Sequence, residues 1–424
     1  MKYKAEIFDK FQYLYDVTGF SDHQVHCVID FKGSADAEVI EKAAFLLLKA
    51  IPILSRTYIN LGKNSYWEDT ASSVWVDLFA VTSNSEDFES FTNSKTDEKT
   101  GPQIKFCLFQ GENDRLSVVI NHMVADGGGF KQCMYMFAEI YSKLLNNPDY
   151  IPEHVIDGDR GFKAIAREQG LLHRLGLLLI NRKDNNQKSA CEFAMDETGS
   201  ASPFIVSREI PEELFRNIKS CCRKSGATVN DLVLAAFFRA LSEMLDIKGK
   251  ELSIPIMIDM RRYQKDKSFS ALTNLASTTI VKNSVLPDES FEATLAKISS
   301  IMNMKKSGKL GMNTFLKLDA GFRIPFMNAY RIMSKTLRHP KTAMTNIGII
   351  DSSKLVFANL PVDNAVMFAS IKYRPYLQLS VTSFNDKMTL GIGLYGSERD
   401  REKIETLLDY LVAELKSCAA AENC

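Results

Sequence analysis

The sequence predicts an α/β protein with the layered character of an α+β sandwich, built as two lobes of mixed sheets and helices. Strand-like alternation, amphipathic helices and hairpin turns follow one another over the 424 residues. A polar stretch, residues 184–203, separates two better-patterned halves. Because one domain usually holds about 100–200 residues, we expect an N-terminal lobe at residues 1–190 and a C-terminal lobe at 191–424.

The first half combines strands with a capped helix. Residues 23–33 alternate apolar and polar side chains, which is the period of a strand. A helix is expected next, with Ser34 or Asp36 as its N-cap and apolar residues recurring every three or four positions. Residues 103–110 and 115–121 flank the turn sequence GEND, which predicts an antiparallel hairpin.

The second half repeats this mixture. A helix is predicted at about residues 211–225, and Thr228 is the predicted N-cap of a strongly apolar helix. A buried strand follows at residues 252–260. Near the end of the chain, Asn385 and Asp386 predict a hairpin turn, and Ser397 begins a final amphipathic helix.

Composition narrows the class of protein. Lys plus Arg and Asp plus Glu are equal at 52 each, so no overall charge attracts nucleic acid or an anionic membrane. No window reaches the roughly 18 apolar residues of a membrane span, and the N-terminus lacks the pattern of a signal peptide. The cysteines show no CxxC spacing, and no metal site is expected. These features predict a cytoplasmic protein without an integral membrane segment.

The densest group of chemically informative residues is VVINHMVADGGGF, residues 118–130. An apolar strand pattern ends at Asn121, and a helical pattern begins after the glycines, so His122 lies in a strand-to-helix turn. An imidazole, with an ordinary pKa near 6.5, can accept and return a proton near neutral pH. The plainer alternative is that Asp126 only caps the helix and that His122 is a loop histidine with a structural hydrogen bond.

The chain resembles the CoA-dependent acyltransferase superfamily with the chloramphenicol acetyltransferase fold, which includes peptide-synthetase condensation domains and alcohol acetyltransferases. Its signature is HxxxDG, and residues 122–127 here read HMVADG. Four further stretches resemble the superfamily in the same order along the chain: residues 47–58, 226–237, 254–263 and 345–348.

The resemblance implies a two-lobed pseudo-dimer with a tunnel between the lobes and His122 midway along it as the general base. Asp126 would be structural, paired with an arginine, and the candidates are Arg56, Arg261 and Arg262. The tetrahedral oxyanion needs preorganised donors, and the candidates are the Gly127 and Gly128 amides and the Thr345 hydroxyl. Thr345 and Asn346 could equally be strand-end residues that bond to their own backbone.

Two departures from the superfamily pattern bear on function. Asn121 stands where condensation domains usually carry a second histidine, and the DFGWG motif of plant families is absent. We therefore expect a free-standing acyltransferase resembling alcohol acetyltransferases, which moves an acyl group from acyl-CoA to a small hydroxyl or amine acceptor. Acyl-CoA would be a co-substrate, no cofactor would be permanently bound, and the protein would be a monomer.

Other interpretations stay open at this point. The donor could be a carrier-protein thioester, as in condensation domains, or the chain could be a catalytically silent binding or scaffold protein. Residues 161–183 predict either a core helix between the lobes or a membrane-surface helix. A set of methionine and phenylalanine side chains could line an acyl or acceptor pocket or simply fill the core. It consists of Met302, Met304, Met312, Phe315, Phe322, Phe326 and Met327.

Overall fold

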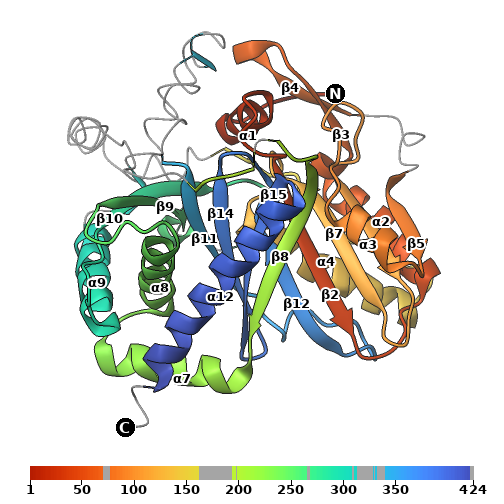
Figure 1. The fold of residues 1–424 in the computed structure, drawn as a ribbon. Helices are drawn as coiled ribbons and strands as arrows, with labels where there is room; N and C mark the ends of the chain where they lie inside the picture. Colours follow the sequence, from red (N-terminus) through yellow and green to blue (C-terminus); the bar gives the residue numbers. More distant parts are fainter. Residues whose placement is uncertain are drawn as a thin grey trace.

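A computed structural model describes most of the chain (Figure 1). The described residues are 1–69, 77–161, 193–196, 198–264, 268–307, 310–312, 328, 330–331 and 340–420. Residues 162–183 of the predicted helix and the boundary at residue 190 fall outside them, as does half of the predicted linker. No helix within the described ranges combines the length and apolar character that crossing a bilayer requires.

The first half is organised around a five-stranded sheet with the order β12-β2-β7-β6-β5. Strands β2 (Gln24–Phe31), β7 (Arg115–Asn121) and β6 (Ile104–Phe109) are antiparallel neighbours, and β5 (Phe79–Thr82) is parallel to β6. The hairpin predicted around GEND is therefore confirmed. A small antiparallel sheet at the N-terminal end has the order β1-β4-β3 and consists of β1 (Lys2–Lys4), β4 (Tyr66–Asp69) and β3 (Arg56–Ile59).

Helices cover both faces of the five-stranded sheet. Helix α2 (Ala37–Ala50) begins at the predicted cap Asp36, whose carboxylate accepts from two backbone amides of the first turn. It packs with α4 (Gly127–Asn146) and the sheet in one apolar core. Helix α3 (Ser85–Thr92) contributes Phe88 to a smaller cluster with β2, β6 and β12.

The second half contains a larger mixed sheet with the order β10-β9-β11-β14-β15-β13, in which β8 also pairs with β15. Its strands are β8 (Ser202–Ile210), β9 (Leu252–Asp259), β10 (Ala276–Asn283), β11 (Thr342–Ile349), β13 (Lys372–Tyr373), β14 (Leu377–Phe384) and β15 (Lys387–Gly396). The predicted hairpin turn is confirmed, because Asn385 and Asp386 have φ values of 43° and 62° between β14 and β15.

Four helices pack against this sheet in a second apolar core: α7 (Glu212–Ser225), α8 (Val229–Met244), α9 (Phe291–Ser307) and α12 (Glu398–Ala420). The predicted cap of α8 is confirmed, because Thr228 and Asp231 form a reciprocal capping box. Figure 1 shows α12 lying along the sheet beside β8 and β15.

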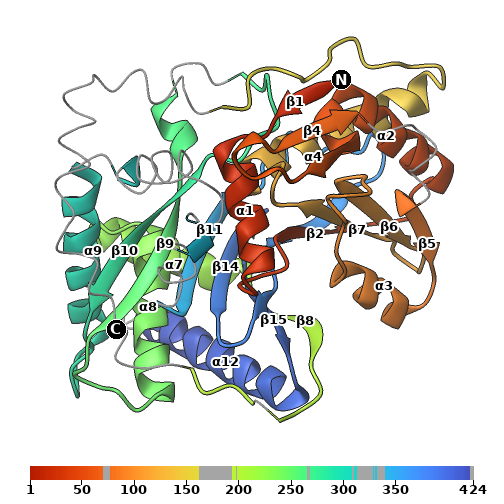
Figure 2. The same ribbon diagram turned by 90° about the horizontal axis from the view of Figure 1, so that it is seen from above.

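Two of the described elements contact both halves. Strand β12 (Val362–Phe368) comes from the second half of the chain but pairs antiparallel with β2 in the first sheet. Helix α1 (Ile7–Val17) lies above the junction (Figure 2) and contributes Phe8 to the core of the second half and Tyr13 to the core of the first. Side chains of both halves therefore meet beneath α1, and the candidate site lies there.

Candidate active site

The predicted strand-to-helix turn is present, and backbone and side-chain bonds fix it. Strand β7 ends at Asn121, which is buried and accepts a hydrogen bond from the Met123 amide at 2.9 Å while donating to Gln103 at 2.9 Å. The His122 amide donates to the His23 carbonyl at 2.7 Å. Asn121 thus has a structural role in this chain, and it holds the backbone from which the His122 side chain projects.

Asp126 is the N-cap of α4 and points into an ion pair. Its carboxylate accepts from the amides of Gly129 at 2.8 Å and Leu275 at 2.7 Å, and the Arg261 guanidinium lies 2.8 Å away. Burial alone would raise the pKa of Asp126, but Arg261 and these amides hold it below its ordinary value. Asp126 is therefore a charged structural group, as the resemblance implies, and Arg261 is its partner.

The other two candidate arginines lie elsewhere. Arg56 forms a bidentate pair with Asp157 at 2.8 Å and also contacts Asp69 at 3.0 Å, so the prediction that it could support Asp126 is wrong. Strand β3 carries Arg56 in the small sheet, and its guanidinium is occupied by these two aspartates. Arg262 is exposed, and its guanidinium lies over the Tyr263 ring.

The three glycines provide space for neighbouring groups. A Cβ on Gly127 would lie 2.9 Å from Ile347, and one on Gly128 would lie 2.8 Å from Nη1 of Arg261. At Gly129 the obstacle is the backbone, because a Cβ would lie 2.9 Å from the Thr273 carbonyl oxygen. The glycines thus allow α4 to start close to β11 and to the Asp126–Arg261 pair.

His122 borders a cavity of about 110 Å³ between the two halves. Besides His122, Asp126 and Gly127, the cavity is lined by α1 and the residues after it, by strands β9, β10 and β11, and by the segment around β13. The side chains that matter below are Phe11, Tyr15, Phe20, Asn274, Thr345 and Lys372. The cavity thus brings residues from both halves to one imidazole.

The surroundings of His122 keep its ring neutral. Burial lowers the pKa of His122 to about 4, although Asp126 and backbone hydrogen bonds act in the opposite direction. Nδ2 of Asn274 lies 3.1 Å from Nδ1 of His122 and donates to the His122 carbonyl at 2.9 Å. The Ala276 amide donates to the Asn274 oxygen at 3.3 Å, which orients the NH₂ group toward His122. Because backbone hydrogen bonds at His122 and Ala125 raise this pKa, a ring N–H donates to a carbonyl there; with that proton on Nδ1, Nε2 is unprotonated and can accept a proton from a substrate.

The remaining predicted residues separate into two groups. Gly127 and Thr345 line the cavity with His122. Asn346 instead accepts from the Gly348 amide at 2.9 Å and contacts Asn230 at 3.4 Å, in keeping with its predicted role as a strand-end residue. Gly128 is packed against Arg261 and is not among the residues that line the cavity. The structure therefore favours Gly127 and Thr345 over Gly128 and Asn346 as neighbours of a reacting group.

The predicted apolar pocket of methionines and phenylalanines is not formed by its described members. Met302 and Met312 are buried in the core of the second half, and Met304 is 70% exposed. The four other predicted members lie outside the described residues. Among the residues described, the apolar wall of the cavity comes from α1 together with Phe20, Val25, Met257 and Ile347.

Sequence reasoning missed five residues that line the cavity. Phe8, Phe11 and Tyr15 form a helical stripe on α1 that was detectable as spacing of three, four and seven residues. Asn274 and Lys372 carried no such local signal, because only the fold brings them to His122.

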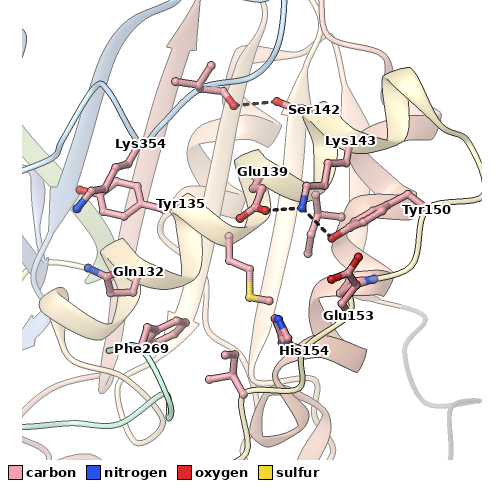
Figure 3. A pocket seen from close by; sticks show the side chains of 15 residues that line it. Gln132, Tyr135, Glu139, Ser142, Lys143, Tyr150, Glu153, His154, Phe269 and Lys354 are labelled. Carbon is pink, nitrogen blue, oxygen red and sulfur yellow. Dashed lines mark hydrogen bonds and ion pairs between the residues drawn. The ribbon is translucent and has the colours of Figure 1, made fainter. Parts of the chain in front are cut away.

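A larger and more open groove, of about 630 Å³, lies along the outer side of α4 (Figure 3). Its polar side chains bond to one another: Lys143 Nζ lies 2.6 Å from Glu139 and 3.4 Å from the Tyr150 hydroxyl. His154 also borders it but is exposed. This groove does not include His122 or Asp126, so it is separate from the candidate site.

Comparisons with known proteins address the fold. No family model matches the chain. A 144-residue segment is 24% identical to cyclosporin synthetase simA of Tolypocladium inflatum, which covers 33% of this chain and only 1% of that protein. Solved structures match over nearly the whole chain. The first condensation domain of the CDA synthetase has a TM-score of 0.70 at 12% identity, covering 99% of this chain and 96% of that one.

Two further structures give the same result. The epimerization domain of the third module of tyrocidine synthetase B has a TM-score of 0.69 at 14% identity, with 97% and 96% of the two chains covered. The trichothecene 15-O-acetyltransferase TRI3 of Fusarium sporotrichioides has a TM-score of 0.69 at 12% identity, with 97% and 95% covered. The chain has the chloramphenicol acetyltransferase-like condensation-domain fold. The predicted two-lobed mixed α/β architecture is thereby confirmed.

Proposed function

We propose that this protein is an acyltransferase that moves an acyl group from an acyl-CoA thioester to a hydroxyl acceptor, with His122 as the general base. The observation that carries the proposal is a neutral imidazole on a cavity between the two halves, beside an aspartate that is turned away into an ion pair. An aspartate so engaged does not compete for the substrate's proton.

The reaction follows from this arrangement. Nε2 of His122 accepts the proton of the acceptor hydroxyl as its oxygen attacks the thioester carbonyl carbon. The tetrahedral intermediate then collapses, the carbon–sulfur bond breaks, and the imidazolium returns the proton to the thiolate. The products are an ester and free CoA, and the protein returns to its starting protonation state without a covalent enzyme intermediate.

In this proposal, two groups stabilise the negative oxygen of the intermediate. The first amides of a helix have no partner within the helix, and Gly127 is the first residue of α4 and lines the cavity. The Thr345 hydroxyl lines the same cavity from β11. Positioned donors of this kind stabilise charge that develops in the transition state.

Structures of the same fold support acyl transfer as the class of reaction. TRI3 is a 15-O-acetyltransferase, and other matches are condensation domains of peptide synthetases. A condensation-type reaction with a carrier-protein thioester is thus the second candidate. The first is favoured by Asn121, which is fully engaged with Gln103 and Met123 and does not supply a second histidine.

The proposal is tested by the release of free thiol. Purified protein is incubated with acetyl-, butyryl-, succinyl- and long-chain acyl-CoA in combination with a panel of alcohols and amines. The same acyl groups are also supplied on a carrier protein. Release from CoA supports the first candidate, and release from the carrier alone supports the second. If no combination gives release above the uncatalysed rate, the scaffold interpretation is favoured.

The role of His122 is tested by substitution. We expect His122→Ala to lower the rate by about 10²- to 10⁴-fold, which is the usual contribution of a general base. His154→Ala is the matched control, because that histidine is exposed at the groove on α4 and should leave the rate unchanged. An unchanged rate in His122→Ala would contradict the general-base proposal.

A further inference from the structure

Lys372 is a buried lysine on the wall of the His122 cavity. It begins the short strand β13, which pairs with β15, and its backbone also bridges to Ser21. The residue is 5% exposed, and it lines the cavity together with His122 and Gly127. A charged side chain buried to this extent normally has a partner of opposite charge.

Lys372 has no such partner in the described part of the chain. Its ammonium donates no hydrogen bond and forms no ion pair with any described residue; it lies over two aromatic rings that also line the cavity. Its Nζ is 4.5 Å from the centre of the Phe20 ring and 5.7 Å from that of Tyr15. Aromatic faces stabilise a cation only in part, so the desolvated charge is left without a full counterpart.

Neither nearby carboxylate forms an ion pair with Lys372. Asp22 attracts Lys372 through space, but one of its oxygens accepts from the Gln24 amide at 3.1 Å, and the other is buried without a hydrogen-bond partner, 3.5 Å from Nε2 of His26. Asp126 is paired with Arg261. Burial accordingly lowers the pKa of Lys372 to about 7. An added anion within the cavity would restore the charged form.

We propose that Lys372 is the anion-binding residue of this site and pairs with a carboxylate carried by one of the two substrates. The inference rests on the proposed function of the His122 cavity and names its substrate class. The carboxylate could belong to a dicarboxylic acyl group on the donor or to a hydroxy acid acceptor. Lys372 is the single lysine or arginine among the cavity-lining residues described, which suits a monoanion better than a phosphate dianion.

The test measures binding rather than turnover, so that it is independent of the general-base proposal. His122→Ala protein is titrated by calorimetry with succinyl-CoA and with butyryl-CoA, which have acyl chains of equal carbon number but differ in the terminal carboxylate. Ligand-observed NMR then compares 4-hydroxybutyrate with 1-butanol as acceptors. The pair in which the anionic member binds more tightly identifies which substrate carries the carboxylate.

We expect a preference of about 10- to 100-fold for the anionic member of one pair, the usual effect of a charge-assisted hydrogen bond. Adding Lys372→Met should reduce the preference to near unity, whereas Lys372→Arg should retain most of it. Lys105→Met is the matched control, because Lys105 also lies over an aromatic ring, 4.9 Å from the centre of Phe91, but outside the cavity. That variant should keep the full preference.

Three results would overturn the inference. The first is equal or undetectable binding within both pairs, and the second is a preference that survives Lys372→Met. The third is a loss of turnover in Lys372→Met that is the same for neutral and anionic substrates with unchanged binding, because it would place Lys372 at the reacting atoms instead. If the carboxylate preference is found but His122→Ala still transfers acyl groups at the normal rate, only the proposed general base fails.

Discussion

Two buried charged side chains, Asp126 and Lys372, border the same cavity, and they differ in whether neighbouring groups balance their charge. Asp126 is held by Arg261 and by the amides of Gly129 and Leu275, so its charge is balanced within the protein. Lys372 forms no hydrogen bond or ion pair with a described residue, and its ammonium lies over the rings of Phe20 and Tyr15. A charge whose partners are all built into the fold stabilises the site, whereas a charge left open to a cavity is available to a ligand. Four measurements test this contrast.

The largest effect is expected from removing the partner of Asp126. We expect Arg261→Met to lower the free energy of unfolding by about 3–5 kcal/mol, because a buried carboxylate would lose its counter-ion. Arg262→Met is the neighbouring control and should change stability by less than about 0.5 kcal/mol, since that side chain is exposed. Denaturant unfolding of both variants measures the difference, and equal stabilities would contradict a structural role for the pair.

At Lys372 we expect the opposite effect on stability: removing its charge should raise the free energy of unfolding. Its folded pKa of about 7 lies below the unfolded value near 10.4, so below pH 7 folding must bury a charge that no described residue pairs with. We expect Lys372→Met to raise the free energy of unfolding at pH 7 by on the order of 3 kcal/mol.

The pH dependence of stability is a control for this prediction. Between pH 7 and 10 the unfolded chain holds a proton on Lys372 that the folded chain has lost, so wild-type stability should rise with pH. The advantage of Lys372→Met should therefore shrink over the same range. A variant that is less stable than wild type at pH 7 would show that Lys372 has a stabilising partner in the protein.

A smaller loss of stability is expected from adding a methyl group near the Asp126–Arg261 pair. Gly129→Ala would push a methyl group against the Thr273 carbonyl, 2.9 Å from its Cβ, and should cost about 1–3 kcal/mol. Gly127→Ala meets Cγ2 of Ile347, a side-chain group that can shift more readily than a backbone carbonyl, and should cost less. Thermal unfolding of the two variants compares them, and an equal loss would argue against close backbone packing at Gly129.

The smallest effect concerns the pH profile, measured with neutral substrates. Because the neutral imidazole is the active form and its pKa is about 4, the rate should stay level from pH 8 to pH 5 and fall only near pH 4. An unshifted histidine would retain roughly a tenth of its neutral form at pH 5.5. Lys372 helps to lower this pKa, so Lys372→Met should move the acid limb upward by less than about one pH unit.

Local patterns in the sequence were sufficient for the elements but not for the way they meet. Side-chain capping identified the starts of α2 and α8 because Asp36 and Thr228 bond to amides only two or three residues away. The HxxxDG turn was likewise predicted from residues that lie close together in the sequence. The partner of Asp126 was left among three arginines, since Arg261 is separated from it by 135 positions along the chain.

The unexpected parts of the site all depend on contacts that are distant in sequence. Asn274 reaches His122 across 152 positions, and Lys372 is placed by a strand that pairs with β15 and by a bridge to Ser21. The spacing of residues along the sequence does not predict contacts between such distant positions. Helix α1 was overlooked for another reason: its aromatic stripe is short and lies at the very start of the chain, where no neighbouring strand pattern framed it.

Strand β12 has a consequence for how this protein could be divided or opened. A fragment that stopped near the middle of the chain would lack the strand that covers β2, and its sheet would end in an exposed, unpaired edge. The two halves are thus held together by a strand that the second half of the chain contributes to the sheet of the first. Moving the two halves apart as rigid bodies would break the backbone hydrogen bonds between β12 and β2.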